Sequence, residues 1–196
     1  ETVPAGWRLD SATCSDGSSP AGVSVDPGEN VTCTFANTKL DTIIVVNRAV
    51  GGDAAFPFTS NTLGAFTMTT ANGEAQRTFT NLAPGAYDLS AIVPAGWTLS
   101  SASCSDGSSL ANINLSAGKT VVCVFIQLKQ DTIVVEKKTI GGDDSFAFNS
   151  PQLGGFVLTT TAGAASRSFV GLQPGAYNIS ETPPAGWVQT AATCDN

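Results

Sequence analysis

The sequence contains no histidine, and charged residues make up only 13% of its 196 positions. Histidine is the side chain that most often serves as general base or metal ligand near neutral pH, so its absence argues against catalysis. The sequence has nine basic and 16 acidic residues, so it carries a net negative charge. A surface that binds nucleic acid is usually basic, so this charge balance argues against nucleic-acid binding. No run of eighteen apolar residues is present, so the sequence predicts no membrane span. We expect no enzyme activity, no cofactor, no metal and no nucleic-acid partner.

What the sequence does contain is one phrase repeated three times, beginning with the letters PAGW. Its tryptophans, Trp7, Trp97 and Trp187, are ninety residues apart, and cysteines and glycine pairs keep the same period. A fixed period indicates tandem repeats. Ninety residues is long for a solenoid unit but suits an independent small β-domain.

The segment 41–130 forms one whole repeat with the pattern of an all-β protein. Apolar residues alternate in short stretches, as in Phe56 and Phe58, and Gly, Pro or Asn-Gly turn signals recur about every ten residues. No stretch has helical periodicity for long enough to form a helix. We predict about seven or eight short strands in an Ig-like β-sandwich.

The ends of the sequence fall inside repeats. Residues 1–40 correspond to the C-terminal part of a preceding sandwich, and residues 131–196 to the N-terminal part of a following one. With no initiator methionine and no signal-peptide pattern, we expect a segment of a longer tandem chain. Joining the two ends head to tail would leave residues 181–196 duplicating residues 1–16, which disfavours simple complementation between copies.

The five cysteines follow the repeat. Cys14 and Cys33 are 19 residues apart, as are Cys104 and Cys123. Neither spacing is that of metal ligands, and a reactive thiol would lack a histidine partner. We therefore predict two disulfides within their own domains, each worth about 3 kcal/mol, and an extracellular location. By the same spacing, Cys194 has no partner within the chain.

Three stretches carry a family resemblance: IVVEKKTIGGDDSFAF, LQPGAYNISETPPAGW, and CSDGSS followed by VTCTF. They resemble the prealbumin-like, SpaA-type (Cna-B-related) repeats of microbial surface proteins, over essentially the whole chain. The resemblance implies a transthyretin-like β-sandwich used as a stalk, pilin or adhesin module, without enzymatic turnover. Fold analogy alone is a weak guide to function, so the residues must be weighed as well.

In some relatives a lysine on the first strand attacks an asparagine on the last strand, assisted by a carboxylic acid, and forms an isopeptide bond. The chemistry needs a neutral amine and a protonated acid in an apolar core. The resemblance gives as candidates Lys137, the acid Glu181 or Glu1, and Asn37. The alternative is that these are ordinary solvated side chains at strand ends. The central repeat has Asn47, Ala91 and Gln127 at these positions, so we expect no cross-link there.

Two further patterns have competing interpretations. Asp-Gly and Gly-Asp pairs could form calcium loops, but without an alternating series of acidic residues they are better explained as turns. Val122, Val124 and Ile126 place apolar side chains on the outer face of the last strand. That strip is either a contact with a partner surface or a strand covered by a local loop.

Taken together, the sequence predicts a structural protein of an extracellular or cell-surface filament or stalk, built from tandem disulfide-stapled β-sandwiches. Its expected partners are copies of itself or further repeats of the same polypeptide, placed end to end. The alternative is an adhesin repeat region that binds a glycan, a host protein or a surface.

Overall fold

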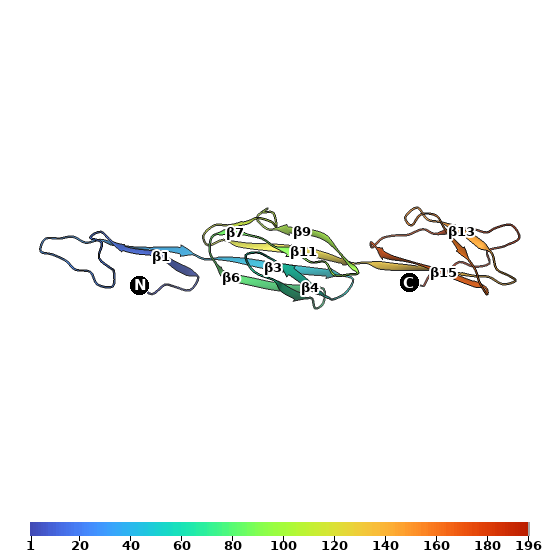
Figure 1. The fold of residues 1–196 in the computed structure, drawn as a ribbon, viewed down its shortest axis with the longest axis horizontal. Helices are drawn as coiled ribbons and strands as arrows, with labels where there is room; N and C mark the ends of the chain where they lie inside the picture. The colour runs from blue at the N-terminus through green and yellow to red at the C-terminus, as the bar shows by residue number, and fades with distance from the viewer. Residues whose placement is uncertain (196) are drawn as a thin grey trace. The chain divides into compact units, whose positions relative to one another are not determined.

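The computed structural model describes residues 1–195, and every regular element among them is a β-strand (Figure 1). The described residues contain no helix long and apolar enough to cross a membrane. The chain divides into two compact units, Glu1–Leu128 and Lys129–Asn196, which we describe separately. The prediction of an all-β fold is confirmed.

The main sheet of the first unit has four strands in the order β6-β3-β11-β9. Their bounds are β3 (Asp41–Val50), β6 (Glu74–Leu82), β9 (Trp97–Cys104) and β11 (Thr120–Lys129). The first and last strands of the repeat, β3 and β11, are parallel neighbours from Thr120 to Leu128, whereas β3 and β6 are antiparallel (Figure 1). The chain therefore enters the repeat at one end of this sheet and leaves it at the other.

Smaller sheets cover one face of the main sheet. One has the order β5-β4-β8, and the other pairs β10 with β7. Their bounds are β4 (Ala55–Thr59), β5 (Phe66–Thr69), β7 (Gly85–Tyr87), β8 (Ser90–Ala91) and β10 (Ile113–Leu115). Along β4, β5, β10 and β11 every second residue is buried between the layers, as a pleated backbone requires.

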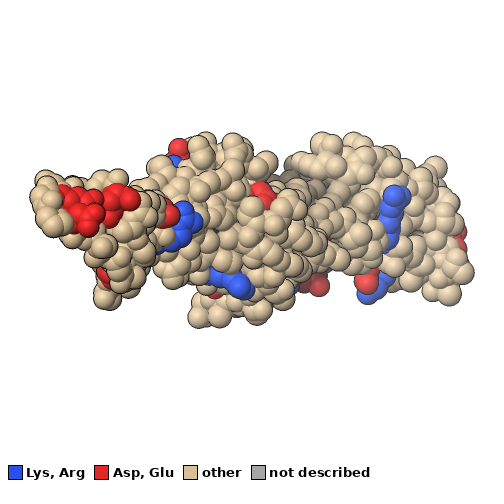
Figure 2. Space-filling model, turned by 60° about the vertical axis from the view of Figure 1, so that its left-hand side comes forward, with Lys and Arg blue, Asp and Glu red and all other residues tan. Residues whose placement is uncertain are grey.

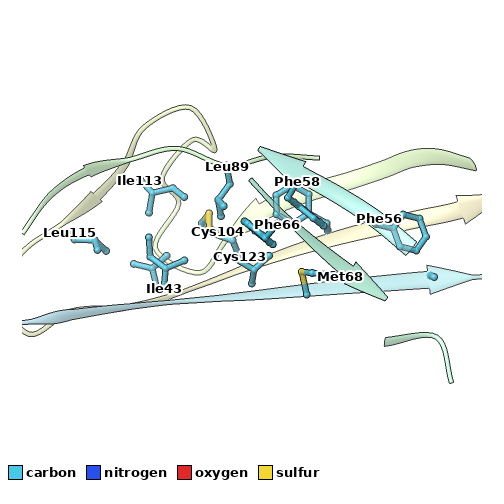
Figure 3. Close-up of a cluster of buried hydrophobic side chains, with 14 residues drawn as sticks. Ile43, Phe56, Phe58, Phe66, Met68, Leu89, Cys104, Ile113, Leu115 and Cys123 are labelled. Atoms are coloured by element: carbon cyan, nitrogen blue, oxygen red, sulfur yellow. A yellow bond between two sulfur atoms is a disulfide. The ribbon is translucent and has the colours of Figure 1, made fainter. Parts of the chain in front are cut away.

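The core between these layers is apolar and closely filled (Figure 3). Ile43 from β3 and Cys123 from β11 meet Phe56 and Phe58 from β4, and all four side chains are fully buried or nearly so. Phe58 stacks on Phe66 with ring centroids 5.1 Å apart. The alternation predicted from the sequence is thus the alternation between core and surface.

The Asn-Gly signal after β5 forms the tight turn that it predicts. Asn72 and Gly73 both have positive φ, at 54° and 81°, a region that favours these two residue types. Asp53 accepts hydrogen bonds from the backbone N–H groups of Asn72 and Gly73, at 3.0 and 2.8 Å. The Gly73 bond is the main reason that the pKa of the Asp53 carboxyl lies below its usual value. This Gly-Asp pair therefore caps a turn, and residues 1–195 contain no cluster of acidic, His or Cys side chains fit for a metal.

The first 40 residues form a single antiparallel hairpin of β1 (Trp7–Cys14) and β2 (Cys33–Lys39). The hairpin corresponds to β9 and β11 of the central repeat, and within residues 1–195 it forms a sheet of these two strands alone. Phe35 therefore remains 43% exposed, whereas its equivalent, Phe125, is fully buried.

The second unit repeats the first half of the sandwich. It comprises β12 (Asp131–Lys138), β13 (Ser145–Asn149), β14 (Phe156–Thr159), β15 (Ala164–Leu172) and β16 (Ser180–Thr182). β12 pairs with β15, and the other sheet has the order β14-β13-β16. Its core is the hydrophobic cluster of Phe146, Phe148, Phe156 and Leu158.

Candidate functional site

Both predicted cysteine pairs form disulfides in the structure. The Cα atoms of Cys14 and Cys33 are 3.9 Å apart, and those of Cys104 and Cys123 are 4.0 Å apart. In each repeat the bond joins two adjacent strands, β1 to β2 and β9 to β11. Cys194 is exposed and has no disulfide partner among residues 1–195.

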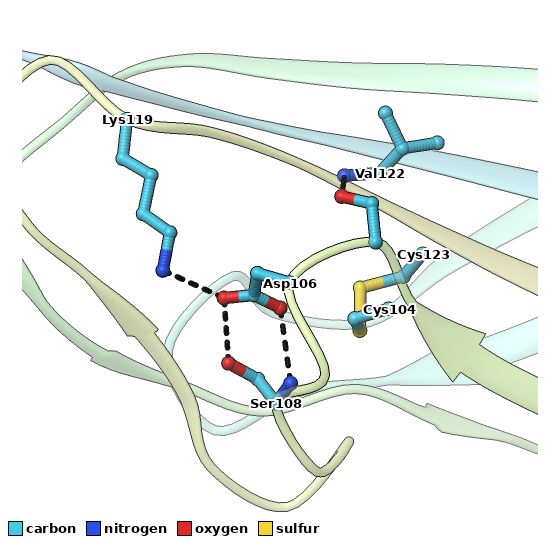
Figure 4. The surroundings of a disulfide bond; sticks show 7 residues. Cys104, Asp106, Ser108, Lys119, Val122 and Cys123 are labelled. Carbon is cyan, nitrogen blue, oxygen red and sulfur yellow. Dashed lines mark hydrogen bonds and ion pairs between the residues drawn. A yellow bond between two sulfur atoms is a disulfide. The ribbon is translucent and has the colours of Figure 1, made fainter.

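The loop that follows Cys104 is fixed by a polar network beside the disulfide (Figure 4). Asp106 accepts hydrogen bonds from the Lys119 Nζ at 2.7 Å and from the Ser108 hydroxyl at 2.7 Å and backbone N–H at 3.0 Å. The Lys119 bond, followed by those from Ser108, holds the pKa of the Asp106 carboxyl well below its usual value. Ser105 accepts a further bond from the backbone N–H of Val122 at 3.0 Å. The loop and β11 are therefore held together independently of the disulfide.

The second unit brings two of the predicted cross-link residues together. Lys137 on β12 places its Nζ 2.6 Å from the Oε1 of Glu181 on β16, and their side chains are 14% and 6% exposed. The same Nζ lies 4.3 Å from the centre of the Phe146 ring. Glu181 Oε1 has no well-aligned hydrogen bond within the described residues, so the contact is a close ion pair. Phe146 also packs edge-to-face on Trp187, with ring centroids 5.1 Å apart. The Lys137 amine and the Glu181 carboxyl group therefore meet beside the Phe146 ring, with little exposure to solvent.

The first unit brings the other two residues together. Asn37 on β2 donates a hydrogen bond from Nδ2 to the Oε1 of Glu1 at 2.6 Å, and both residues are exposed. Each unit thus holds one acid with one of its expected partners. Glu181 stands beside the amine, and Glu1 beside the amide.

In the central repeat, the amide side chains of Asn47 and Gln127 occupy the positions of Lys137 and Asn37. Asn47 and Gln127 are fully buried, and neither side-chain amide has a hydrogen-bond partner in the described part of the chain. In the parallel register Asn47 lies opposite Phe125, and Gln127 lies opposite Ala49, so the two amides are diagonal neighbours on the core face. Sequence reasoning identified the substitutions but not that they leave buried amides unpaired, since spacing carries no signal for hydrogen-bond satisfaction.

A second feature that the sequence did not reveal is the junction between the N-terminal hairpin and the central repeat. Gly118 donates its backbone N–H to the carbonyl of Lys39 at 3.2 Å, and Thr42 donates to the carbonyl of Lys119 at 3.0 Å. The buried carboxylate of Asp41 accepts the Lys119 backbone N–H at 2.7 Å. A loop of the central repeat therefore holds the incoming chain on both sides of Leu40.

The strip of Val122, Val124 and Ile126 points away from the core, and its three side chains are partly exposed. In the parallel register Val122 lies opposite Ile44, which is also partly exposed, whereas Val124 lies opposite Val46, which is buried. Charged side chains are scattered thinly over most of the face in Figure 2. The role of this strip as an interface remains a proposal.

Comparison with known proteins finds a family that matches nearly the whole chain. The model of a family described as a prealbumin-like fold domain matches residues 1–39, 43–129 and 133–196, so the resemblance seen in the sequence is confirmed. Domains of this SpaA type are structural domains of surface proteins. No curated protein matches the chain. Among solved structures, the Bacillus anthracis TIE protein is similar at 15% identity and a TM-score of 0.36, over 96% of this chain and 46% of that one. The chain thus spans less than half the length of that structure.

Proposed function

Because this chain belongs to the prealbumin-like fold domain family, we propose that it is a load-bearing segment of an extracellular filament or stalk. The observation that carries the proposal is the parallel pairing of β3 with β11. The chain enters the repeat at Asp41 and leaves it at Lys129, at opposite ends of two neighbouring strands. Tension on the chain then shears all the hydrogen bonds of the pair at once, instead of opening them one by one.

The junction at Asp41 supports the same function. A flexible linker would let successive domains move independently. Here three backbone groups and a buried carboxylate fix the chain between Lys39 and Thr42. Asp41 is only 1% exposed, and its hydrogen bond to the Lys119 backbone ties the incoming chain to the loop of the central repeat. We infer that repeats follow one another in a defined orientation.

We further propose that the flanking repeats carry covalent cross-links which the central one lacks. In a complete repeat, the amine at the Lys137 position first passes a proton to the carboxylate at the Glu181 position, and its Nζ then attacks the side-chain carbonyl carbon of an asparagine at the Asn37 position. The acid at the Glu181 position passes protons between the amine, the carbonyl oxygen and the leaving group. A carbon–nitrogen bond forms, ammonia leaves, and the mass falls by about 17 Da. Close contact of Lys137 with Glu181, beside Phe146, supports this chemistry.

Electron microscopy of the native material tests the filament. Strands of ten residues span about 33 Å, so a filament should show beads spaced by about 35–45 Å along its axis. Short isolated rods that end on a surface would instead support the adhesin stalk. Compact particles with neither form would refute both.

A further inference from the structure

The turn between β5 and β6 carries a chemically labile pair. Asn72 is the only asparagine of the chain that is followed by glycine, and its side chain is exposed to water. In such a pair the glycine nitrogen attacks the side-chain carbonyl carbon of the asparagine, and glycine hinders the attack least because it has no Cβ. The turn requires glycine here, since a Cβ on Gly73 would lie 3.0 Å from the Ala49 carbonyl oxygen.

Asp53, on the connection between β3 and β4, holds both backbone N–H groups of this turn. Its Oδ1 accepts the Gly73 N–H at 2.8 Å, and its Oδ2 accepts the Asn72 N–H at 3.0 Å. The Gly73 carbonyl accepts the N–H of Ala49 at 2.8 Å. Gly73 is therefore held on both sides, and its nitrogen cannot turn toward the Asn72 side chain without losing the bond to Asp53.

The Asp53 carboxylate is placed to slow the attack and not to assist it. To act as a general base, it would have to remove the proton of a backbone amide. The hydrogen bond from Gly73, more than any other contact, lowers the pKa of the Asp53 carboxyl below its usual value, so this group is a weak base. A weak base that holds the N–H keeps the proton on the nitrogen, and a protonated amide nitrogen is a poor nucleophile.

The second unit has the same turn without the labile residue. Ala162 and Gly163 have φ values of 53° and 82°, close to the 54° and 81° of the central repeat. Asp143 accepts their backbone N–H groups at 2.9 and 2.8 Å. The turn and its aspartate therefore form without asparagine, and the labile amide is a feature of the central repeat.

We propose that Asn72 is a deamidation site that reacts when the turn between β5 and β6 comes free of Asp53, which is the positioning residue that protects it. The Gly73 nitrogen bonds to the Asn72 side-chain carbon, the carbon–nitrogen bond of the amide breaks, and ammonia leaves with the glycine proton. Water then opens the resulting cyclic imide at either carbonyl. The product is aspartate or isoaspartate, with a net gain of about 1 Da.

Either product prevents the turn from closing again as before. Aspartate places a second carboxylate beside Asp53, and like charges at short range repel each other. Isoaspartate adds a carbon atom to the main chain of a two-residue turn whose geometry depends on two positive φ values. The tie between this turn and the connection from β3 to β4 is then lost permanently. Reaction at Asn72 therefore records that the central repeat has been open.

Peptide mapping by mass spectrometry, on the full chain in mildly alkaline buffer, tests the protection. Asn72 should gain about 1 Da much more slowly in the folded chain than in urea. Asp53→Ala should raise the rate in the folded chain about tenfold or more, the factor expected for losing a hydrogen bond to a charged group. Asp143→Ala is the matched control. It removes the same contacts from the turn of Ala162 and should leave the rate at Asn72 unchanged.

The remaining outcomes are equally definite. A slower reaction in Asp53→Ala would identify the carboxylate as a base and overturn the proposal, as would an unchanged rate. Equal rates in the folded and the urea-unfolded wild type would also overturn it. If circular dichroism shows that Asp53→Ala does not fold, Asp53→Asn decides, because it keeps the shape of the side chain and one acceptor oxygen. Its rate should lie between those of the folded wild type and the unfolded chain, and a rate equal to the folded wild type would refute the protection. None of these results depends on filament assembly or on the lysine–asparagine bond of the proposed function.

Discussion

The buried amide of Gln127 gives the sharpest test of how the central repeat differs from its neighbours. Its side chain is fully buried, and neither its oxygen nor its nitrogen has a hydrogen-bond partner among residues 1–195. A buried unpaired polar group costs about 1–3 kcal/mol. Methionine has a similar length, is unbranched and removes both polar atoms without leaving a cavity. We expect Gln127→Met to raise the free energy of unfolding of the central repeat by about 1–3 kcal/mol.

Urea denaturation followed by the fluorescence of Trp97 measures this change, in a background in which Trp7 and Trp187 are replaced by phenylalanine. With a denaturant dependence of about 2 kcal/mol per molar, the midpoint should rise by about 0.5–1.5 M at unchanged slope. Gln76→Met on the exposed face of β6 is the matched control and should change stability by less than about 0.5 kcal/mol. If Gln127→Met destabilises the repeat by 1 kcal/mol or more, the amide has a partner and the reasoning is wrong.

Three other perturbations have definite expected results. Replacing Cys104 and Cys123 by serine should lengthen the chain released in single-molecule force spectroscopy by about 65 Å, because the bond closes 19 residues at about 3.4 Å each; an unchanged length would contradict the pairing. Val124→Asp should weaken filament assembly while the melting temperature stays nearly constant, and a large loss of stability would instead place that side chain in a packed interior. Asp106→Asn should be destabilising at pH 7, where the low-pKa carboxylate is charged, and the difference should vanish as pH falls well below 3.8. A difference that is independent of pH would show that the charge contributes nothing.

Much of the fold could be predicted because its signals are local. Alternation at Phe56 and Phe58 fixes which side chains enter the core, and the Asn72-Gly73 pair fixes a turn through its positive φ. The parallel pairing of β3 with β11 has no such signal. The period of two in a strand says which face a residue occupies but not which strand lies beside it.

The candidate site, too, could be predicted from the sequence only in part. The resemblance identified Lys137 and Glu181, and the structure places their charged groups 2.6 Å apart. The contact between Asp41 and Lys119 joins residues 78 positions apart and could not be read from either sequence neighbourhood.

The disulfide and the proposed lysine–asparagine bond join different pairs of strands. In the proposed filament, this difference would determine how each repeat responds to tension. The disulfide joins Cys104 on β9 to Cys123 on β11, so it does not bridge the parallel pair of β3 and β11 that would carry the load in the proposed filament. A bond between the positions of Lys137 and Asn37 does bridge that pair, because they correspond to Asn47 on β3 and Gln127 on β11. A repeat with the lysine–asparagine bond cannot extend by separating its first and last strands, whereas the central repeat can. If the flanking repeats carry the proposed bond, the central repeat, with Asn47 in place of the lysine, should be the one that yields first under force, with the disulfide limiting how far it extends.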